Sequence, residues 1–453
     1  MKISVIGCGR LGVPYATGLA IGGHEVLGLD VAPATVRILS AGRAPFEEPG
    51  LAEAIARHRD DGTLRFTNSY DDVAAHADLH ILCVGTPQQA GGELAADLSD
   101  LNTAVVDLVP RLERDAVIVV KSSVPVGTTA HLGGVARSLA PAGVTVTVVC
   151  SPDFLREGMS LEDTACPSRI VLGLPPDPGD AEATLRQAWD FQIAAGSPLV
   201  VTDLTTAEMC KTAANAFLAT KVSSINAFAA LCEATAGDVR QLSRALALDP
   251  RIGGDFLAAG LGWGGSCLPK DLRSLIAQGR ERGLADLQIL AEADAINQRR
   301  QARAVELARQ ACGGVLLGRR VGVWGLAFKP GVDDIRDSPA LAVALAIHGE
   351  GGIVSAYDPM AIGIARAAHP ELSYADSAAD ALVDADVLLH LTAWPEFTGV
   401  GRERLVRLAR LARTPVVVDG HAALDQAEWI SAGWAVESLG RAPAAVAVGV
   451  GRA

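Results

Sequence analysis

Short apolar runs alternate with longer amphipathic segments along the first part of the chain. The runs lie at residues 3–7, 25–30, 79–84, 116–121 and 144–150, and shorter ones lie at 170–172 and 199–202. Segments with helical spacing separate them. Strands that alternate with helices build a parallel sheet with helices on both faces. The pattern therefore predicts a doubly wound α/β domain over residues 1–203.

The pattern becomes helical after residue 203 and returns to strands after residue 313. The alanine-rich segment 208–233 has few helix breakers, so we expect one long helix within a central helical, dimerising domain over 204–312. Later apolar runs lie at 320–324, 353–358, 387–392 and 415–419. They predict a third domain over 313–453 that resembles half of a doubly wound sheet, followed by a loosely held tail after Gly440. The expected fold class is thus α/β, with two doubly wound parallel-sheet domains joined by a long central helix.

Composition and charge narrow the possible partners. The 453 residues carry a net charge of −13 with a pI near 5.2, which argues against nucleic acid and anionic membranes. The N-terminus runs directly into a strand, and no apolar run approaches the length of a membrane span. Eight scattered cysteines without a CxxC pair favour a reduced, cytoplasmic protein with neither a disulfide framework nor a metal site.

The first strand ends in a glycine fingerprint. Residues 7–12 read Gly-Cys-Gly-Arg-Leu-Gly between a strand and a helix that extends to Ile21, and Asp30 ends the second strand. Such glycines allow a tight turn and close approach of a pyrophosphate, and the acid accepts the ribose hydroxyls. The pattern predicts a Rossmann domain that binds NAD, because Asp30 would repel the 2′-phosphate of NADP.

Polar loops follow three of the later strands of this domain. They are Gly85-Thr86-Pro87, Ser122-Ser123-Val124-Pro125 and Ser151-Pro152-Asp153-Phe154-Leu155-Arg156-Glu157. Ligands of doubly wound sheets bind at the carboxyl edge of the strands. These loops therefore predict the ligand side of the domain.

A glycine-rich loop with one cysteine lies before a predicted helix. Residues 262–271 read Gly-Trp-Gly-Gly-Ser-Cys-Leu-Pro-Lys-Asp, with Pro269 and Asp271 placed for a first helical turn. The helix N-terminus and Lys270 would stabilise a thiolate at Cys267, and the small glycines would let a substrate approach the backbone. A buried structural cysteine fits this stretch equally well. Lys211 and Asn215 share a helix face, which by spacing alone fits a solvated surface.

Taken together, the motifs resemble those of the UDP-glucose/GDP-mannose dehydrogenase family over essentially the whole chain. The matching stretches are 7–12, 84–87, 121–127, 154–158, Lys211 with Asn215, 264–271, 328–330 and 334–336. Arg251-Ile252-Gly253, sixteen residues before Cys267, resembles the UDP-glucose branch, and Ser266 replaces the histidine of branches that oxidise N-acetylated sugars. The resemblance favours a nucleoside-diphosphate glucose as substrate.

The resemblance implies a four-electron oxidation of C6 from alcohol to carboxylate with two NAD⁺. Cys267 would hold the aldehyde as a thiohemiacetal and then a thioester, which water releases as the acid. It also implies a homodimer or a higher homo-oligomer, in which Arg251 enters the partner's active site.

The same resemblance assigns roles residue by residue. The implied catalytic residues are Cys267, Lys211, Asn215, Asp271, Asp153 and Ser123. The implied cofactor-binding residues are Gly7, Gly9, Arg10, Leu11, Gly12, Asp30, Thr35, Thr86, Ser123, Glu157, Lys270 and Arg336. The implied substrate-binding residues are Asp153, Phe154, Leu155, Arg156, Glu157, Lys211, Asn215, Arg251, Phe256, Leu257, Gly260, Gly264 and Lys329.

Four positions depart from the family pattern. Asp153 replaces a glutamate and Ser123 a threonine, while Thr35 and His421 stand where basic residues are usual. The nucleobase therefore stays open between UDP and dTDP. GDP-mannose 6-dehydrogenase, a two-electron β-hydroxyacid or 6-phosphogluconate-type dehydrogenase, and a catalytically silent nucleotide-binding module are the alternatives. The silent module fits least, because binding alone needs no nucleophile.

Overall fold

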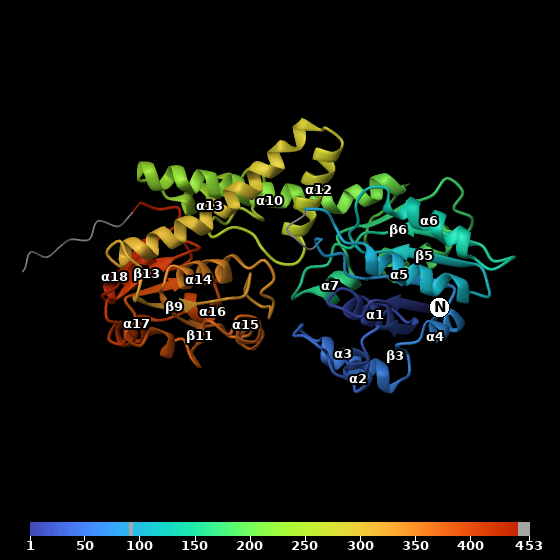
Figure 1. Ribbon diagram of the computed structural model, residues 1–453, viewed down its shortest axis with the longest axis horizontal. Coiled ribbons are helices and arrows are strands. Elements are labelled where there is room, and N and C mark those ends of the chain that lie inside the picture. The colour runs from blue at the N-terminus through green and yellow to red at the C-terminus, as the bar shows by residue number, and fades with distance from the viewer. Residues whose placement is uncertain (90–93, 443–453) are drawn as a thin grey trace, which may run out of the picture. The chain divides into compact units, whose positions relative to one another are not determined.

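A computed structural model describes residues 1–89 and 94–442 of the chain (Figure 1). It divides into two compact units. Unit 1 comprises Met1–Ala214 and Arg273–Leu284, and unit 2 comprises Asn215–Leu272 and the chain from Ala285. Each unit contains one sheet. The three-part division at residues 203 and 312 stays a prediction.

Unit 1 is built on an eight-stranded sheet in the order β3-β2-β1-β4-β5-β6-β7-β8. Its strands are β1 Lys2–Ile6, β2 Glu25–Leu29, β3 Leu64–Thr67, β4 Leu79–Leu82, β5 Ala116–Val120, β6 Val146–Cys150, β7 Ile170–Leu174 and β8 Leu199–Asp203. Its helices are α1 Gly12–Ile21, α2 Pro33–Ser40, α3 Leu51–Asp60, α4 Tyr70–His76, α5 Ser99–Leu108, η1 Val109–Arg111, α6 Thr128–Leu139, α7 Ser160–Ala165, α8 Ala181–Ala188 and α9 Asp190–Ala194. The predicted doubly wound domain is confirmed, with β3 as an additional strand.

One pairing of this sheet departs from the predicted parallel arrangement. Strands β6 and β7 pair antiparallel, at Cys150 and Gly173, whereas β7 and β8 are parallel to each other. Between β6 and β7 the chain forms only the six-residue helix α7. Without a long crossover helix the chain does not return to the start of β6, so β7 begins at the edge where β6 ends.

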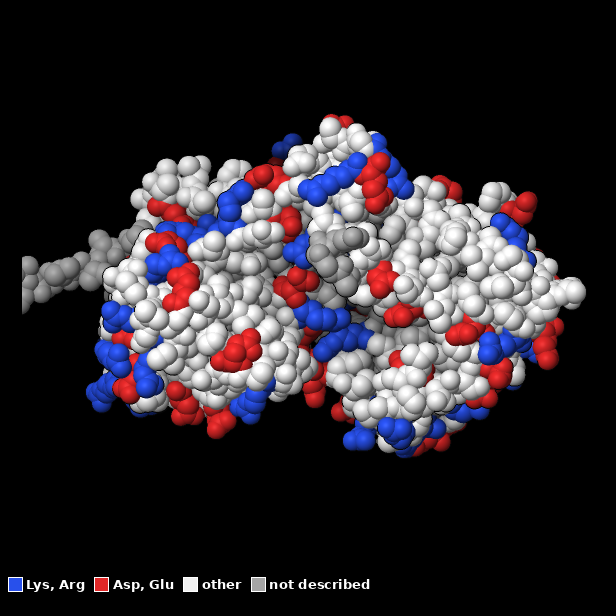
Figure 2. All heavy atoms as spheres, in the orientation of Figure 1, with Lys and Arg blue, Asp and Glu red and all other residues white. Residues whose placement is uncertain are grey.

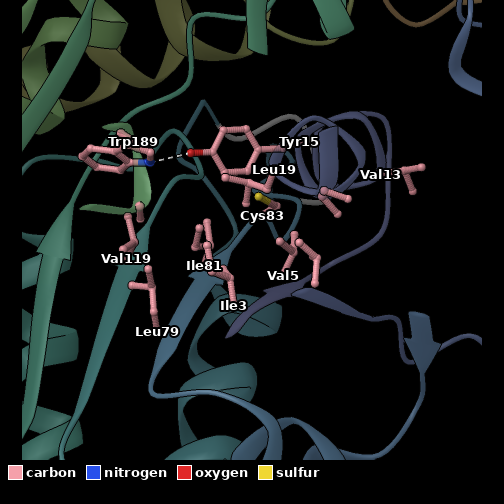
Figure 3. Close-up of a cluster of buried hydrophobic side chains, with 14 of the residues drawn as sticks. Ile3, Val5, Val13, Tyr15, Leu19, Leu79, Ile81, Cys83, Val119 and Trp189 are labelled. Atoms are coloured by element: carbon pink, nitrogen blue, oxygen red, sulfur yellow. Dashed lines mark hydrogen bonds between the residues drawn. The ribbon is translucent and has the colours of Figure 1, made fainter. Parts of the chain in front are cut away.

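Two apolar cores cover the two faces of this sheet. Ile3 and Val5 of β1 belong to one core and Ile6 to the other, as the two-residue period of a strand requires. The first core is closed by Trp189, whose indole Nε1 donates a hydrogen bond of 2.9 Å to the Tyr15 hydroxyl (Figure 3). Apart from the more exposed edge strand β8, both faces of the sheet are therefore covered by apolar side chains, and the strand ends are the part that a ligand can reach.

A histidine lies fully buried within this sheet and gives unit 1 a pH-dependent stability. His80 of β4 is hydrogen-bonded through Nδ1 to Ser4 Oγ at 2.7 Å, and burial lowers its pKa to about 4. Between that value and the ordinary histidine pKa of about 6.5, the unfolded chain binds a proton that the folded chain does not. Stability is therefore complete above this window and falls as the pH falls through it.

We expect the free energy of unfolding of unit 1 to lose about 2 kcal/mol between pH 7 and pH 5 through His80 alone. Urea denaturation of wild type and His80→Asn at both pH values measures this loss. The asparagine keeps a polar group near Ser4 and does not titrate, so its stability should fall by about 2 kcal/mol less. Equal losses in the two proteins would contradict the assignment.

Helix α10 (Leu204–Thr235) begins where β8 ends and runs unbroken for 32 residues (Figure 1). The predicted helix over 208–233 is confirmed and starts four residues earlier. The other helices of the middle segment are α11 Val239–Ala247, α12 Leu268–Glu281, η2 Ala285–Leu287 and α13 Gln288–Ala311. Among the described residues, no helix is long and apolar enough to cross a membrane.

Unit 2 contains a six-stranded parallel sheet in the order β11-β10-β9-β12-β13-β14. Its strands are β9 Arg320–Trp324, β10 Ile353–Tyr357, β11 Ser373–Tyr374, β12 Val387–His390, β13 Val416–Asp419 and β14 Ala435–Ser438, and its helices are α14 Pro339–Gly349, α15 Ile362–Ala368, η3 Asp380–Leu382, α16 Pro395–Thr398, α17 Arg402–Ala409 and α18 Gln426–Ser431. The predicted second doubly wound parallel sheet is confirmed, and it is a full six-stranded sheet rather than the half that we expected. The two edge strands were missed because β11 has two residues and β14 includes a glutamate and a serine.

The end of the described chain is fixed in place. The backbone N–H of Gly440 donates to Glu233 Oε1 at 2.8 Å, and Arg441 forms an ion pair of 2.7 Å with Asp238. Glu233 is also paired with the buried Arg300. The loosely held tail therefore does not begin at Gly440, and residues 443–453 of the predicted tail lie outside the described residues.

Candidate active site

The glycine fingerprint of unit 1 has the shape that a dinucleotide requires. Gly7 has φ +94°, and a Cβ on Gly12 would lie 1.8 Å from the carbonyl oxygen of Gly7. A Cβ on Gly9 would have no protein atom within 4 Å. Gly7 and Gly12 thus permit the tight turn, while Gly9 leaves open space where a pyrophosphate approaches the N-terminus of α1. The residues present fit NAD.

Asp30 is fixed beside this loop at the end of β2. Its carboxylate oxygens accept hydrogen bonds from the backbone N–H groups of Cys8 (3.1 Å) and Ala32 (2.9 Å). Around it, Arg10 stacks over the Phe46 ring at 5.1 Å, Leu11 precedes α1, and Thr35 lies in α2. The acid is thus held where a ribose hydroxyl would meet it.

We expect kcat/KM for NAD⁺ to exceed that for NADP⁺ by about a hundredfold or more, because a 2′-phosphate would lie against the Asp30 carboxylate. Steady-state rates with the two cofactors give the ratio. Asp30→Asn keeps an oxygen acceptor but not the charge, so the preference should shrink while NAD⁺ is still used. Equal use of both cofactors by the wild type would contradict the role of Asp30.

Two polar loops are joined at the carboxyl edge of the sheet. The hydroxyl of Thr86 donates to the Ser123 carbonyl at 2.8 Å, and the hydroxyl of Ser122 donates to the Val84 carbonyl at 2.6 Å. The loops after β4 and β5 therefore form one rigid rim. The structure brings the predicted residues Thr86 and Ser123 together.

A buried ion pair lies at the same edge. Lys211 Nζ of α10 is 3.8 Å from Asp153 Oδ2 in the loop after β6, and the two residues are 5% and 9% exposed. The backbone N–H of Leu155 donates to the other oxygen of Asp153 at 2.9 Å. The Phe154 ring lies beside this pair, with Lys211 Nζ 5.6 Å and the Arg169 guanidinium 3.7 Å from its centroid. The alternative prediction, that Lys211 lies on a solvated helix face, is therefore wrong.

A second buried lysine supports the same loop. Lys121, directly after β5, lies over the Tyr15 ring at 4.4 Å and donates a long hydrogen bond of 3.5 Å to the Ser151 carbonyl. Burial lowers the pKa of Lys121, and the Asp153 carboxylate opposes that shift. The charge of Lys121 thus interacts favourably with the Asp153 carboxylate, a role that the sequence motif alone did not reveal.

Carboxylates hold the rest of the predicted substrate loop. The Arg156 backbone and guanidinium both donate to Asp163, and Glu48 accepts from the backbone N–H groups of Gly158 (2.9 Å) and Ser160 (2.8 Å). The loop that carries Glu157 is thereby fixed on both sides. Glu48 lies 110 residues before Gly158, and Asp163 lies seven residues after Arg156, outside the motif. The sequence motif therefore did not reveal either residue.

Unit 2 holds the second group of predicted residues. Asn215 Nδ2 donates to Asp271 Oδ2 at 2.7 Å, and Lys270 Nζ donates to Asp271 Oδ1 at 2.8 Å. Asp271 is 1% exposed. The buried carboxylate of Asp271, on the first turn of α12, thus orients both the amide of Asn215 on α10 and the ammonium of Lys270. The structure brings these three residues together as a chain of hydrogen bonds.

Cys267 is the residue directly before α12. Its carbonyl accepts from the backbone N–H of Asp271 at 3.0 Å, and its Sγ is 3.5 Å from the hydroxyl of Ser266. Cys267 is half-buried, whereas Cys8, Cys83 and Cys150 are buried and burial raises the pKa of each thiol. Cys267 therefore combines partial exposure with a helix N-terminus, as a nucleophilic thiolate requires.

The glycines of the preceding loop serve close packing within unit 2. A Cβ on Gly260 would lie 2.6 Å from His421 Nδ1, and one on Gly264 would lie 2.3 Å from the Asp337 carbonyl oxygen. Asn297, 4% exposed, exchanges two hydrogen bonds with the Trp263 backbone. Protein atoms thus occupy the Cβ directions of these two glycines, and the close approach of a substrate to the loop backbone stays a prediction.

The remaining predicted substrate and cofactor residues of unit 2 lie on other loops. Arg251 has an 87% exposed side chain that pairs with Asp249 at 2.6 Å. Phe256 is 41% exposed and has φ +60°, a conformation that bulky residues avoid and that often marks functional loops. Leu257 is buried next to it, Lys329 Nζ lies 5.6 Å from the Phe328 ring, and the Arg336 guanidinium pairs with Asp334 at 2.5 Å.

The His421 ring lies against Gly260, next to the glycine-rich loop. Its Nε2 hydrogen-bonds the Leu391 carbonyl at 2.8 Å, and burial together with the nearby His390 lowers its pKa. His390 is itself fully buried and hydrogen-bonded to Asp419 at 3.1 Å. The chain therefore presents an uncharged ring at the position where the family pattern has a basic residue.

A fingerprint domain fitted to a dinucleotide, with a thiol and oriented Lys, Asn and Asp side chains, defines the class of the protein: it is an NAD-dependent dehydrogenase. Family models for the NAD-binding, central and UDP-binding domains of the UDP-glucose/GDP-mannose dehydrogenase family match residues 1–187, 205–299 and 322–426. The chain belongs to this family, so the resemblance read from the motifs is confirmed.

Individual relatives match over nearly their whole length. UDP-glucose 6-dehydrogenase of Rhizobium meliloti is 36% identical over 97% of this chain and 100% of its own. The Haloferax volcanii enzyme AglM, also a UDP-glucose 6-dehydrogenase, is 38% identical over 93% and 96%. The structure of a UDP-glucose dehydrogenase from Pyrobaculum islandicum superposes with a TM-score of 0.89 at 36% identity over 98% of both chains.

Proposed function

We propose that the protein oxidises C6 of UDP-glucose to the carboxylate, with Cys267 as the covalent nucleophile. The observation that carries this proposal is the hydrogen-bond chain that joins Asn215 of α10 to Asp271 and Lys270 on the first helical turn after the cysteine. A dehydrogenase that stops at the aldehyde needs no thiol beside such a group. The names of the relatives support UDP-glucose as the substrate.

The reaction consumes one alcohol, one water and two NAD⁺ and yields one carboxylate, two NADH and three protons. NAD⁺ supplies the hydride acceptor in both oxidations. In the first, Lys211 and Asn215 stabilise the developing alkoxide at O6 as its proton leaves. The Cys267 thiolate then adds to the aldehyde carbon, and loss of a second hydride leaves a thioester. Asp153 orders the water that cleaves it, which restores the thiolate.

The remaining predicted residues bind the two ligands. Ser123, Thr86, Glu157, Lys270 and Arg336 contribute to the NAD site, and Phe154, Leu155, Arg156, Phe256, Leu257, Gly260, Gly264 and Lys329 contribute to the substrate site. The half-exposed Phe256 ring suits a nucleobase or sugar face. Neutral His421 and the short Asp153 make a second nucleobase acceptable, so dTDP-glucose is the secondary substrate of this proposal.

The proposal is tested by NADH release over a panel of UDP-glucose, dTDP-glucose, GDP-mannose and UDP-N-acetylglucosamine. We expect two NADH per sugar with UDP-glucose, and a kcat/KM at least about tenfold above that for GDP-mannose, since one misfitted group costs about 1.4 kcal/mol or more. One NADH per sugar would favour the two-electron alternative. A preference for GDP-mannose would place the chain in the other branch of the family.

The proposal includes a homodimer built on α10. Within unit 2 this helix exposes Phe217 (79%), Phe228 (49%) and Leu231 (58%), which lie three or four residues apart or whole turns apart on one face.

All eight cysteines are free thiols, which fits a reducing, cytoplasmic compartment. Acidic and basic side chains lie mixed on the face in Figure 2, and the net charge of −13 disfavours a nucleic-acid partner.

A further inference from the structure

The first turn of α6 is held by a buried side chain from α10. Glu208 is 2% exposed, and its two carboxylate oxygens accept hydrogen bonds of 2.6 Å from the backbone N–H groups of Gly127 and Thr129. These N–H groups begin a twelve-residue helix and have no partner within it. The negative charge also lies at the positive end of the α6 dipole. The start of α10 is therefore anchored to this turn.

The same turn is held by a second helix. Gln278 of α12 accepts a hydrogen bond of 3.1 Å from the backbone N–H of Val126, and its Nε2 contacts Ser274 one turn earlier at 3.4 Å. Both partners belong to unit 1. Residues 126–129, which we name the α6 turn, thus bind side chains from α10 and from α12.

Each of these contacts lies close to a residue of the proposed site. Glu208 precedes Lys211 by three positions, so the two side chains share a face of α10 one turn apart. Ser123 lies three residues before Val126, whose backbone N–H donates to Gln278. Helices are stiff, so a helix that is fixed at one turn holds the side chains of neighbouring turns in register.

We propose that Glu208 and Gln278 are positioning residues for the oxidation, and that the α6 turn sets the register of Lys211 and Ser123, both in unit 1, from one place. This inference rests on the proposed function, because it concerns the same reacting carbon. Misplacement by about 1 Å lowers catalysis by about a hundredfold, whereas binding of the distant nucleotide is spared. A residue with only a stabilising role would change the melting temperature and leave kcat of the folded enzyme intact.

The test uses Glu208→Gln, Gln278→Ala and their combination in the full-length enzyme. Glutamine keeps the shape of Glu208 but turns an amide NH₂ group, which cannot accept a hydrogen bond, toward one of the two N–H donors. We expect kcat with UDP-glucose to fall about tenfold or more in each single variant, while KM for UDP-glucose changes less than about threefold. Because both residues hold one turn, the double variant should lose less than the product of the single losses.

The matched control is Asp425→Ala, which removes the carboxylate that caps α18 in unit 2 by accepting from the Glu428 N–H. It should lower the melting temperature and leave kcat unchanged. If Glu208→Gln and Gln278→Ala melt earlier but keep wild-type kcat below their melting temperatures, the inference is overturned. Equal kcat losses in Asp425→Ala would overturn it as well. A wild type without NADH release on any sugar would instead refute the proposed function.

Discussion

Replacing Cys267 by serine should lower kcat for acid formation by about a thousandfold or more, with UDP-glucose bound nearly as in wild type. The first hydride transfer needs only a proton acceptor near O6 and a correctly placed cofactor, and Lys211, Asn215 and Asp271 are retained. The second needs a tetrahedral C6 that bears a leaving hydride. A serine hydroxyl stays protonated near neutral pH and seldom adds, so the two oxidations become separated.

The measurement is NADH per sugar, together with aldehyde trapped by hydrazine. Wild type should release two NADH per sugar and no trappable aldehyde, whereas Cys267→Ser should turn over slowly and release one NADH for each aldehyde trapped. Cys166, an exposed free thiol, provides the control, because Cys166→Ser removes a thiol without touching the proposed site. A serine variant at 267 that keeps near-wild-type turnover and two-to-one stoichiometry would make this thiol structural.

Mixing two inactive variants should restore activity if Arg251 serves the partner's site. Arg251→Ala and Cys267→Ala are each expected to be inactive alone, and a mixed dimer contains one site with both native residues. Random exchange of equal amounts should therefore recover about a quarter of the wild-type rate. The side chain of Arg251 is 87% exposed and pairs with Asp249 two residues away, which suits a residue that reaches outward from its own chain.

The exchange itself must be shown, for example by mass spectrometry of differently tagged chains. Arg280→Ala, on the last turn of α12, serves as the matched surface control and should be active without mixing. No recovery after demonstrated exchange would place Arg251 in the site of its own chain or outside any site. Dilution below the dissociation constant of the dimer should then leave activity unchanged.

The sequence predicted the strands that carry long apolar runs and failed for those that do not. Strands β1, β2 and β4 to β8 all begin or end within a few residues of their predicted positions. Strand β3 was missed because Arg65 interrupts it, and β11 because two residues leave no pattern. The direction of β7 was wrong, since apolar periodicity carries no information on whether a strand returns or crosses over.

Candidate chemistry was predictable where it is local, and not where it depends on contacts between distant segments. The four-residue spacing of Lys211 and Asn215 predicted a shared helix face. The ion-pair partner of Lys211, Asp153, lies 58 positions earlier in the sequence, and local spacing could not predict that contact. Glu208 and Gln278 have no motif that separates them from ordinary surface residues. The glycines near Cys267 are predicted to admit a ligand, and the coordinates add that His421 lies in the Cβ direction of Gly260 and Asp337 in that of Gly264.

The division of the chain has a consequence for its synthesis. Unit 1 needs residues 273–284, but the ribosome makes residues 215–272, which belong to unit 2, before them. At about 5–20 residues per second, roughly 3 to 12 s pass between the synthesis of the two parts of unit 1. During that time the nascent N-terminal unit lacks Gln278, the acceptor for the backbone N–H of Val126 in the α6 turn. A premature stop codon anywhere before residue 273 therefore truncates the N-terminal unit itself, even when it falls within a segment of the other unit.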